Sequence, residues 1–261
     1  MTLKNIRDHH NRTHTSNNMR FVIAGKLHGR KSELKRQLEE WELPTGERFE
    51  APQDEFKSGK PTLIRRKEAS NLTFAWSMIV PRELSDEESD AMNCLDHILT
   101  GTMHSRIYGA ARKKGLAYGM FSDTSVGFHD SSWDFGGQVN LDTADGLFDI
   151  IVRELKQVLE GNITEAEIDA AKSYALGRHQ MGAQTVAQVS NFYTNRYFAD
   201  GVVKEYEKVP DSINGTSRDI MIRTAREFIG HNISVLAGVS SGERSEIVEL
   251  NEKLATLFTE K

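Results

Sequence analysis

Histidines gather near the start of the sequence at a spacing that metal sites use. His9, His10 and His14 lie close together, and His10 and His14 are separated by one helical turn. On a helix the imidazoles of His10 and His14 would therefore stand on one face, as they do in helical metal sites. The stretch is also typical of a polar helix that binds no metal. We expect no specific metal binding there.

A second group that could do chemistry is a serine near the end of the sequence. The run Gly238-Val-Ser240-Ser-Gly242 matches the Gly-x-Ser-x-Gly pattern and lies between an expected strand and an expected helix, as a nucleophile elbow does. An esterase triad also needs an aspartate and a later histidine, but the last histidine, His231, precedes Ser240. A hydrolase that uses Ser240 is therefore a rival hypothesis, and we expect the match to be a coincidence.

Composition and charge exclude several classes of protein. The sequence has 261 residues and a formal net charge of −5, which argues against nucleic acid or an anionic membrane as a partner. It has no apolar run of about 18 residues that could cross a membrane, and its first ten residues lack the apolar centre of a signal peptide. Cys94, the single cysteine, lies on an apolar helix face, so we expect a buried structural thiol and a cytoplasmic location.

The stretch 99–122 contains the most informative spacing in the chain. An apolar helix begins after Ser85, which is its expected N-cap, and breaks at Gly101. A short basic helix is expected over 105–114, with Gly115 ending it, and an apolar strand over 116–122.

Two parts of this stretch resemble a known signature. Ser105-Arg-Ile-Tyr108 and the later Arg112-Lys-Lys-Gly-Leu-Ala-Tyr118 are similar to the SRLF…R-x-x-x-GLAY pattern of pitrilysin/insulinase-type zinc peptidases. That family includes the mitochondrial processing peptidases and many bacterial zinc proteases. Its members contain paired homologous domains, of which one carries an inverted zinc motif and the other is metal-free. The resemblance is strongest over 99–122 and 163–171.

The zinc motif of that family, His-x-x-Glu-His on a helix, does not occur in this sequence. The corresponding place reads Asn93-Cys-Leu-Asp-His97, with an asparagine where the first histidine ligand would stand. A single histidine cannot hold zinc by itself. The resemblance therefore implies a metal-free domain with no catalytic residues and no cofactor of its own. Zinc is expected in a homologous catalytic partner domain.

The resemblance also implies which residues would bind a peptide substrate. Family members place a tyrosine and an arginine of the metal-free domain over the active site of the other domain, and Tyr118 and Arg112 match them. Arg112 precedes Tyr118 by one residue less than is usual. Gly101 falls where processing-peptidase relatives carry a glycine-rich loop that handles substrate. The alternatives are a basic surface helix followed by a core strand, and a helix C-cap at Gly101.

An internal repeat indicates the domain organisation. The expected strand over Met19–Gly25 and the helix that ends at Trp41 parallel a strand ending at Gly238 and the final helix of the chain. We therefore interpret 1–50 as the tail of an upstream homologous domain, 51–60 as a linker and 61–261 as the metal-free domain. The order of elements predicts an α+β fold, a two-layer sandwich in which helices cover a mixed, mostly antiparallel sheet.

These observations predict the non-catalytic half of a zinc metalloendopeptidase, which binds an extended peptide beside the zinc site of its partner. The alternative is a scaffold or protein-binding module with no remaining role in proteolysis. We expect the chain alone not to hydrolyse peptides. An unpaired strand over 19–25 would be an exposed edge and could also drive dimerisation.

Overall fold

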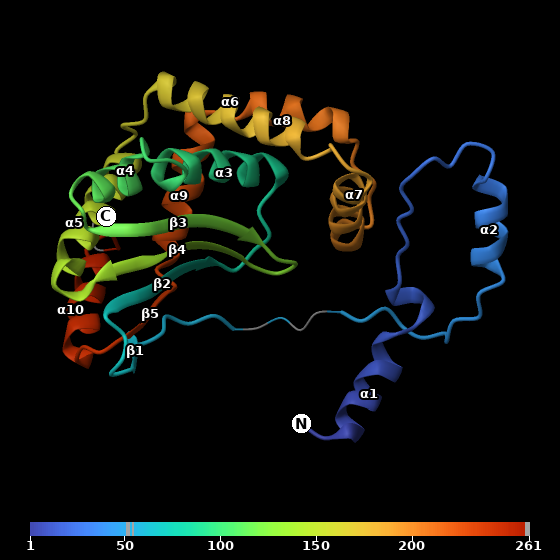
Figure 1. Cartoon of the computed structure of the whole chain (residues 1–261), viewed down its shortest axis with the longest axis horizontal. Coiled ribbons are helices and arrows are strands. Elements are labelled where there is room, and N and C mark those ends of the chain that lie inside the picture. The colour runs from blue at the N-terminus through green and yellow to red at the C-terminus, as the bar shows by residue number, and fades with distance from the viewer. Residues whose placement is uncertain (51–52, 54, 259–261) are drawn as a thin grey trace. The chain divides into compact units, whose positions relative to one another are not determined.

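The computed structural model describes residues 1–50, 53 and 55–258 (Figure 1). The chain divides into two compact units. The first unit comprises 1–53 and 178–209, and the second comprises 54–177 and 210–261. Three residues of the expected linker, namely 51, 52 and 54, lie outside the described residues.

The second unit contains a five-stranded sheet with the strand order β1-β5-β2-β4-β3. The strands are β1 (Thr62–Arg65), β2 (Asn71–Val80), β3 (Ala117–Val126), β4 (Ser131–Asn140) and β5 (Ser234–Ser240). β1 pairs in parallel with β5, and all the other pairs are antiparallel. The prediction of a mixed, mostly antiparallel sheet is confirmed.

Helices cover the sheet (Figure 1). The second unit contains all or most of the helices α3 (Asp86–Thr100), α4 (Arg106–Lys113), α5 (Ala144–Leu159), α6 (Glu165–Met181), α8 (Val209–Gly215), α9 (Arg218–His231) and α10 (Arg244–Ala255), with the short 3-10 helix η2 (Leu141–Thr143) before α5. α3 packs on β3, α9 on β2, and α10 on β1 and β5. The α+β sandwich predicted from the order of elements is confirmed.

The alternation of side chains along β2 explains why helices pack on one face of the sheet. Leu72, Phe74 and Trp76 are buried, whereas Thr73 and Ala75 between them are exposed. A strand places successive side chains on opposite faces, so one face of the sheet enters the core and the other stays open. The largest fully buried aromatic side chains are Trp76, Trp133, Phe135, Phe148 and Phe228.

Local signals set the helix ends as predicted. Ser85 accepts from the backbone N–H of Glu88, and the Glu88 carboxylate accepts from the Ser85 N–H. Thr164 and Glu167 make the same reciprocal pair at the start of α6. Gly115 follows α4 with a φ of +68°, a left-handed conformation that glycine adopts at little cost. The expected N-cap at Ser85 and the glycine stop at Gly115 are therefore confirmed, and each of the two helices begins with a capping box.

The first unit contains helices and has no strand among its described residues. Its elements are α1 (Leu3–Thr13), α2 (Lys31–Glu39) and α7 (Val186–Asp200), with the 3-10 helices η1 (Ser16–Asn18) and η3 (Tyr206–Lys208). The strand predicted over 19–25 is wrong for the chain as it stands. A strand needs a neighbour to satisfy its backbone N–H and C=O groups, and the described part of this unit offers none.

Candidate functional site

Tyr118 projects from a bulge near the start of β3. Ala117 pairs with Val139 on β4, and Gly119 pairs with Gln138, so Tyr118 is an extra residue without a partner across the ladder. The side chain of Tyr118 is 85% exposed. A bulge re-aims the side chain of its extra residue. The bulge in β3, the strand at one edge of the sheet, therefore exposes the Tyr118 phenol to solvent.

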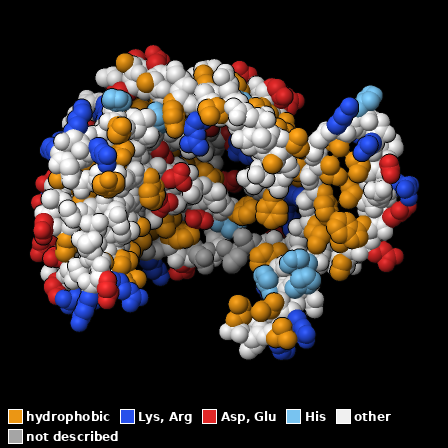
Figure 2. Space-filling view, in the orientation of Figure 1, with side chains coloured by type: hydrophobic (Ala, Val, Ile, Leu, Met, Phe, Trp, Pro, Cys, Tyr) orange, Lys and Arg blue, Asp and Glu red, His pale blue; other side chains and the backbone are white. Residues whose placement is uncertain are grey.

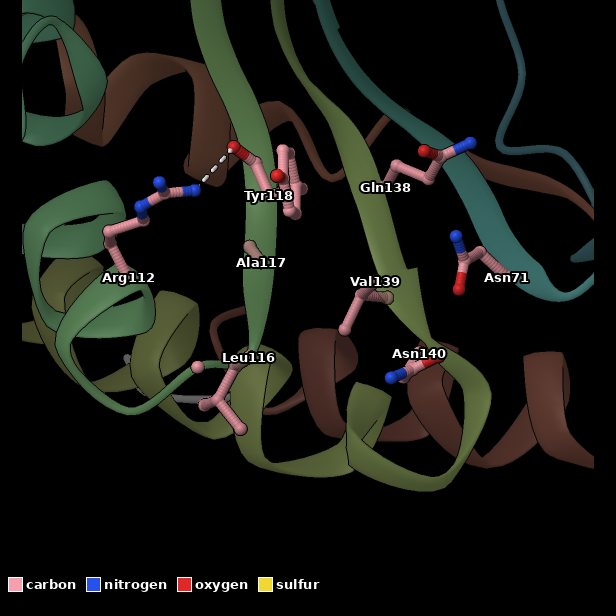
Figure 3. A pocket seen from close by; sticks show the side chains of 9 residues that line it. Asn71, Arg112, Leu116, Ala117, Tyr118, Gln138, Val139 and Asn140 are labelled. Atoms are coloured by element: carbon pink, nitrogen blue, oxygen red, sulfur yellow. Dashed lines mark hydrogen bonds between the residues drawn. The ribbon is translucent and has the colours of Figure 1, made fainter.

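Arg112 reaches Tyr118 from the last turn of α4 (Figure 3). Its Nη1 donates to the backbone carbonyl of Tyr118 at 3.3 Å, and its Cζ lies 5.1 Å from the centroid of the Tyr118 ring. The Tyr108 hydroxyl donates to the same carbonyl at 3.3 Å. A guanidinium this close to a ring is attracted to its π face. The short spacing in sequence thus does not keep the two side chains apart, because Gly115 turns the chain back beside α4.

The pair borders a cavity of about 270 Å³. Its polar lining comes from three strands and a helix, with Asn71 on β2, Gln138 and Asn140 on β4, and Arg112 and Tyr118 (Figure 3). Amide side chains both donate and accept, and the guanidinium only donates. Such a lining is chemically suited to the N–H and C=O groups of an extended peptide.

The open face of the sheet continues from this cavity. Phe121 on β3 is half-exposed and lies over Gly136 on β4, where an added Cβ would meet the ring at 2.6 Å. Asp123 and Asp134 are opposite each other in the β3–β4 register. Burial and the neighbouring Asp134 raise the pKa of Asp123. Beside Tyr118 the face therefore combines one exposed aromatic ring with a polar, acidic region that sequence reasoning missed.

Gly101 does not line the cavity, although it was predicted as a substrate-binding residue together with Arg112 and Tyr118. It ends α3 with φ −66° and ψ −22°, a right-handed conformation that any residue can adopt. An added Cβ would collide with the imidazole of His97. The glycine is thus explained by a close approach to His97 rather than by a left-handed C-cap.

The residues at the place of the zinc motif point in different directions. Asn93 is exposed, and Asp96 is buried, where it accepts from Trp133 Nε1 and from Thr124 Oγ1 at 2.8 Å each. Burial raises the pKa of Asp96 to about 7. The ring of His97 stacks on Tyr174 at 3.9 Å. Asp96 therefore joins α3 to β3 and β4, a structural role that its neighbours in sequence do not reveal.

The remaining chemical motifs fall in unreactive surroundings. Ser240 is buried, and its hydroxyl accepts from the N–H of Gly242 at 3.0 Å, so the Gly-x-Ser-x-Gly match is a strand end rather than a nucleophile elbow. Cys94 is buried, and burial raises the pKa of its thiol to about 11. His10 on exposed α1 and His14, which directly follows this helix, stack at 4.1 Å. In the described part of the chain, no group of three His, Cys, Asp or Glu side chains is placed to hold a metal ion. That this chain binds no metal stays a prediction.

Among the described residues no helix is both long and apolar enough to cross a membrane.

Comparison with solved structures gives the same fold. The chain is similar to a protease from Helicobacter pylori, with a TM-score of 0.77 and 19% identity over 92% of this chain and 59% of that one. An M16 peptidase inactive domain from Pseudomonas fluorescens gives a TM-score of 0.74 and 14% identity over 93% and 58%. A chain of complex III2 from Candida albicans gives 0.73 and 11% over 87% and 56%. The chain thus spans less than three fifths of the length of these structures.

A comparison with curated proteins finds no match. The family model of the M16 peptidase inactive domain matches residues 1–174, which is more than half of the chain. This match includes the whole of the segment that carries Arg112 and Tyr118, and it confirms the resemblance to the metal-free domain of a zinc peptidase family. The chain belongs to the family of the M16 peptidase inactive domain.

Proposed function

We propose that this chain is the non-catalytic half of a zinc metalloendopeptidase, which binds an extended peptide and closes the chamber around it. The catalytic half is a homologous domain with the His-x-x-Glu-His motif, in the same polypeptide or in a separate subunit. The proposal includes a cytoplasmic location, for which the buried thiol of Cys94 is the support.

The observation that carries the proposal is the exposed pair of Tyr118 and Arg112. A tyrosine that served only the core would bury its ring, yet this one is 85% exposed beside a cationic group and a polar cavity. The bulge in β3 costs one ladder pairing to place the phenol there. Such a local cost is understandable where a side chain must face a ligand.

In the assembled enzyme these two side chains would act on the substrate carbonyl. The phenol hydroxyl and the guanidinium are both hydrogen-bond donors. Donors aimed at a carbonyl oxygen bind it in the ground state and stabilise the negative charge that develops during attack. The zinc of the partner would supply the activated water. The asparagine and glutamine side chains of the cavity would hold the peptide backbone.

The second candidate is a scaffold domain without a role in proteolysis. The same fold in a chain of a structure named complex III2 is the reason to consider it. A scaffold would have no use for the Tyr118 hydroxyl, so the two functions make opposite predictions for that group.

The test measures zinc content and peptide cleavage for the chain alone, for the catalytic domain alone and for the two combined. We expect no zinc and no cleavage for the chain alone, and cleavage after combination. Tyr118→Phe should lower kcat/KM of the combined enzyme by about 100-fold, the usual cost of one oxyanion donor. Tyr174→Phe, which removes the hydroxyl of a half-exposed tyrosine on α6, is the matched control.

Stoichiometric zinc in the chain alone, or cleavage by the chain alone, would overturn the proposal. Full activity of the Tyr118→Phe enzyme would favour the scaffold instead.

A further inference from the structure

Residues 1–50 bury no apolar side chain, and only Thr15 among them is buried. Exposed large side chains in this segment include Phe21 at 46%, Ile23 at 45% and Trp41 at 54%. Figure 2 shows hydrophobic side chains gathered over the part of the chain that contains α2. A groove of about 430 Å³ lies there, lined by Ile23, Leu27, Lys31, Leu34, Lys35, Leu38 and Glu39. A segment with this composition does not reach a stable fold without burying its apolar side chains.

The chain itself contains a copy of this segment. Residues 19–41 align with 232–254 without a gap, and α2 and α10 begin at the equivalent positions Lys31 and Arg244. The identical pairs are Val22 and Val235, Ala24 and Ala237, Gly25 and Gly238, Gly29 and Gly242, Ser32 and Ser245, Glu33 and Glu246, and Glu39 and Glu252. The two segments are thus repeats of one strand–loop–helix unit.

The second copy shows what surrounds such a unit when it has its partners. β5 lies between β1 and β2, parallel to the first and antiparallel to the second. Leu236 is 0% exposed, and Ile247 and Leu254 on α10 are each 1% exposed. An added Cβ on Gly238 would touch Leu72 of β2 and Ile247 of α10. In the second copy the strand is therefore paired on both edges, and the inward side chains of the strand and the helix are buried.

The buried positions of the second copy correspond to exposed or half-exposed positions of the first. Ile23 stands at the place of Leu236, Leu34 at that of Ile247, and Trp41 at that of Leu254. Each of these positions is apolar in both copies, but in the first copy the described residues supply no sheet beside them. What the first copy lacks is a pair of strands and the helices behind them.

We infer that residues 19–41 dock as a strand and a helix into the sheet of a second α+β sandwich domain of the same family. The strand over 19–25 inserts between two strands of that domain, parallel to one and antiparallel to the other. Ile23 then faces the helix-covered side, as Leu236 does, while Val22 and Ala24 face the open side. The inference deepens the proposed function and rests on it only in naming the partner as the metal-bearing domain.

The test is amide hydrogen exchange of the full chain, alone and combined with the His-x-x-Glu-His domain that is encoded with it, as a separate subunit or as the preceding part of one polypeptide. We expect the amides of residues 21–25 to exchange at least about 100-fold more slowly in the combined form, because an inserted strand is paired on both edges. The fluorescence of Trp41 should shift to shorter wavelength as its ring is buried.

Ile23→Asp is expected to weaken association by at least about 100-fold, since it places a charge on the buried side of the inserted strand. Phe49→Asp is the matched control, because Phe49 is 44% exposed in the same unit and lies outside the repeat. It should leave association unchanged. Trp41→Ala should weaken association while the free chain keeps its unfolding midpoint, since the ring is not buried there.

Unchanged exchange at 21–25 in the combined form overturns the inference, as does an absence of association or equal effects of Ile23→Asp and Phe49→Asp. Protection that appears in the chain alone, together with a dimer in sedimentation, also overturns it and makes a second copy the occupant. The two proposals fail separately. Docking without a Tyr118→Phe effect removes only the proposed function, whereas a Tyr118→Phe effect without protection at 21–25 removes only the docking.

Discussion

Arg106 and Glu167 form a bidentate ion pair that joins the two segments in which the family resemblance is strongest. Arg106 Nε donates to Glu167 Oε1 at 2.6 Å, and Nη2 donates to Oε2 at 2.7 Å. Nη2 also donates to the carbonyl of Asn162 at 2.6 Å. Glu167 at the same time closes the capping box of α6 with Thr164. The arginine of the signature thus holds the start of α4 against the start of α6.

Replacing Arg106 should destabilise the second unit. Arg106→Ala leaves a partly buried carboxylate without its bidentate donor, and we expect a loss of about 2 kcal/mol in the free energy of unfolding. Arg106→Lys should recover only part of this loss, because an ammonium group keeps the charge but cannot make the two parallel hydrogen bonds of the guanidinium. Urea unfolding measures both. Arg218→Ala is the control, since its pair with the 74%-exposed Glu165 should contribute less than about 1 kcal/mol. Equal losses for Arg106→Ala and Arg218→Ala would contradict the prediction.

Asp96 should make the chain less stable as the pH rises from about 4 to 7. Its pKa is raised to about 7 in the folded state from 3.8, so over this range the folded state holds a proton that the unfolded state has lost. Each pKa unit corresponds to 1.36 kcal/mol, which gives at most about 4 kcal/mol. Asp96→Asn should remove this slope while an amide oxygen still accepts from Trp133. Urea unfolding at pH 4, 5.5 and 7 measures it, and parallel curves for the two proteins would refute the assignment.

Glu88 and Glu167 should act in the opposite direction in acid. Hydrogen bonds from Arg82 and Arg106 lower the pKa of these two carboxyls to about 2 from 4.5. Their stabilisation is complete above pH 4.5 and is lost as the pH falls towards 2. Glu167→Gln should therefore unfold with a shallower dependence on pH below 4.5. The experiment fails the prediction if the variant and the parent lose stability equally between pH 4.5 and 2.

Arg112 should matter for activity much more than for stability. Both it and Tyr118 lie at the surface, so Arg112→Ala should change the free energy of unfolding by less than about 1 kcal/mol. In the combined enzyme the same change should lower kcat/KM by about 100-fold. Lys113→Ala, which removes a neighbouring charge of α4 outside the cavity lining, should keep full activity. Equal losses of activity in the two variants would mean that general charge, rather than the contact with Tyr118, is responsible.

Gly101→Ala separates a packing role from a role in substrate handling. The backbone at Gly101 suits alanine, but the new Cβ would push His97 away from its stack with Tyr174. We expect a loss of about 1–3 kcal/mol in the free energy of unfolding. His97→Ala in the same chain should cancel only part of that loss, because it removes the imidazole but leaves the Cα of His97 at 2.9 Å from the new methyl group. If Gly101→Ala leaves the stability of the chain unchanged but lowers the peptidase activity of the combined enzyme, the role of Gly101 in handling substrate is supported instead.

Much of the local structure could be predicted because its causes are local. The N-caps at Ser85 and Thr164 are satisfied by glutamates one turn later, and Gly115 ends α4 through its own backbone conformation. The alternation of Leu72, Phe74 and Trp76 likewise needs no distant residue to define which side of β2 enters the core. The resemblance of Ser105–Tyr118 to a family signature then indicated which fold these elements belong to.

Long-range contacts decided what the sequence could not. Residues 19–25 and β5 belong to two copies of one repeat, yet only β5 forms a strand, because β1 and β2 lie beside it and hydrogen-bond to its backbone groups. In the sequence Asp96 stands at the place of a metal motif, whereas in the structure its carboxylate accepts hydrogen bonds from Trp133 and Thr124. The sequence by itself determined the repeat and the chemistry of Arg112 and Tyr118. Only the tertiary structure decided which copy is buried and that the bulge in β3 brings guanidinium and phenol together.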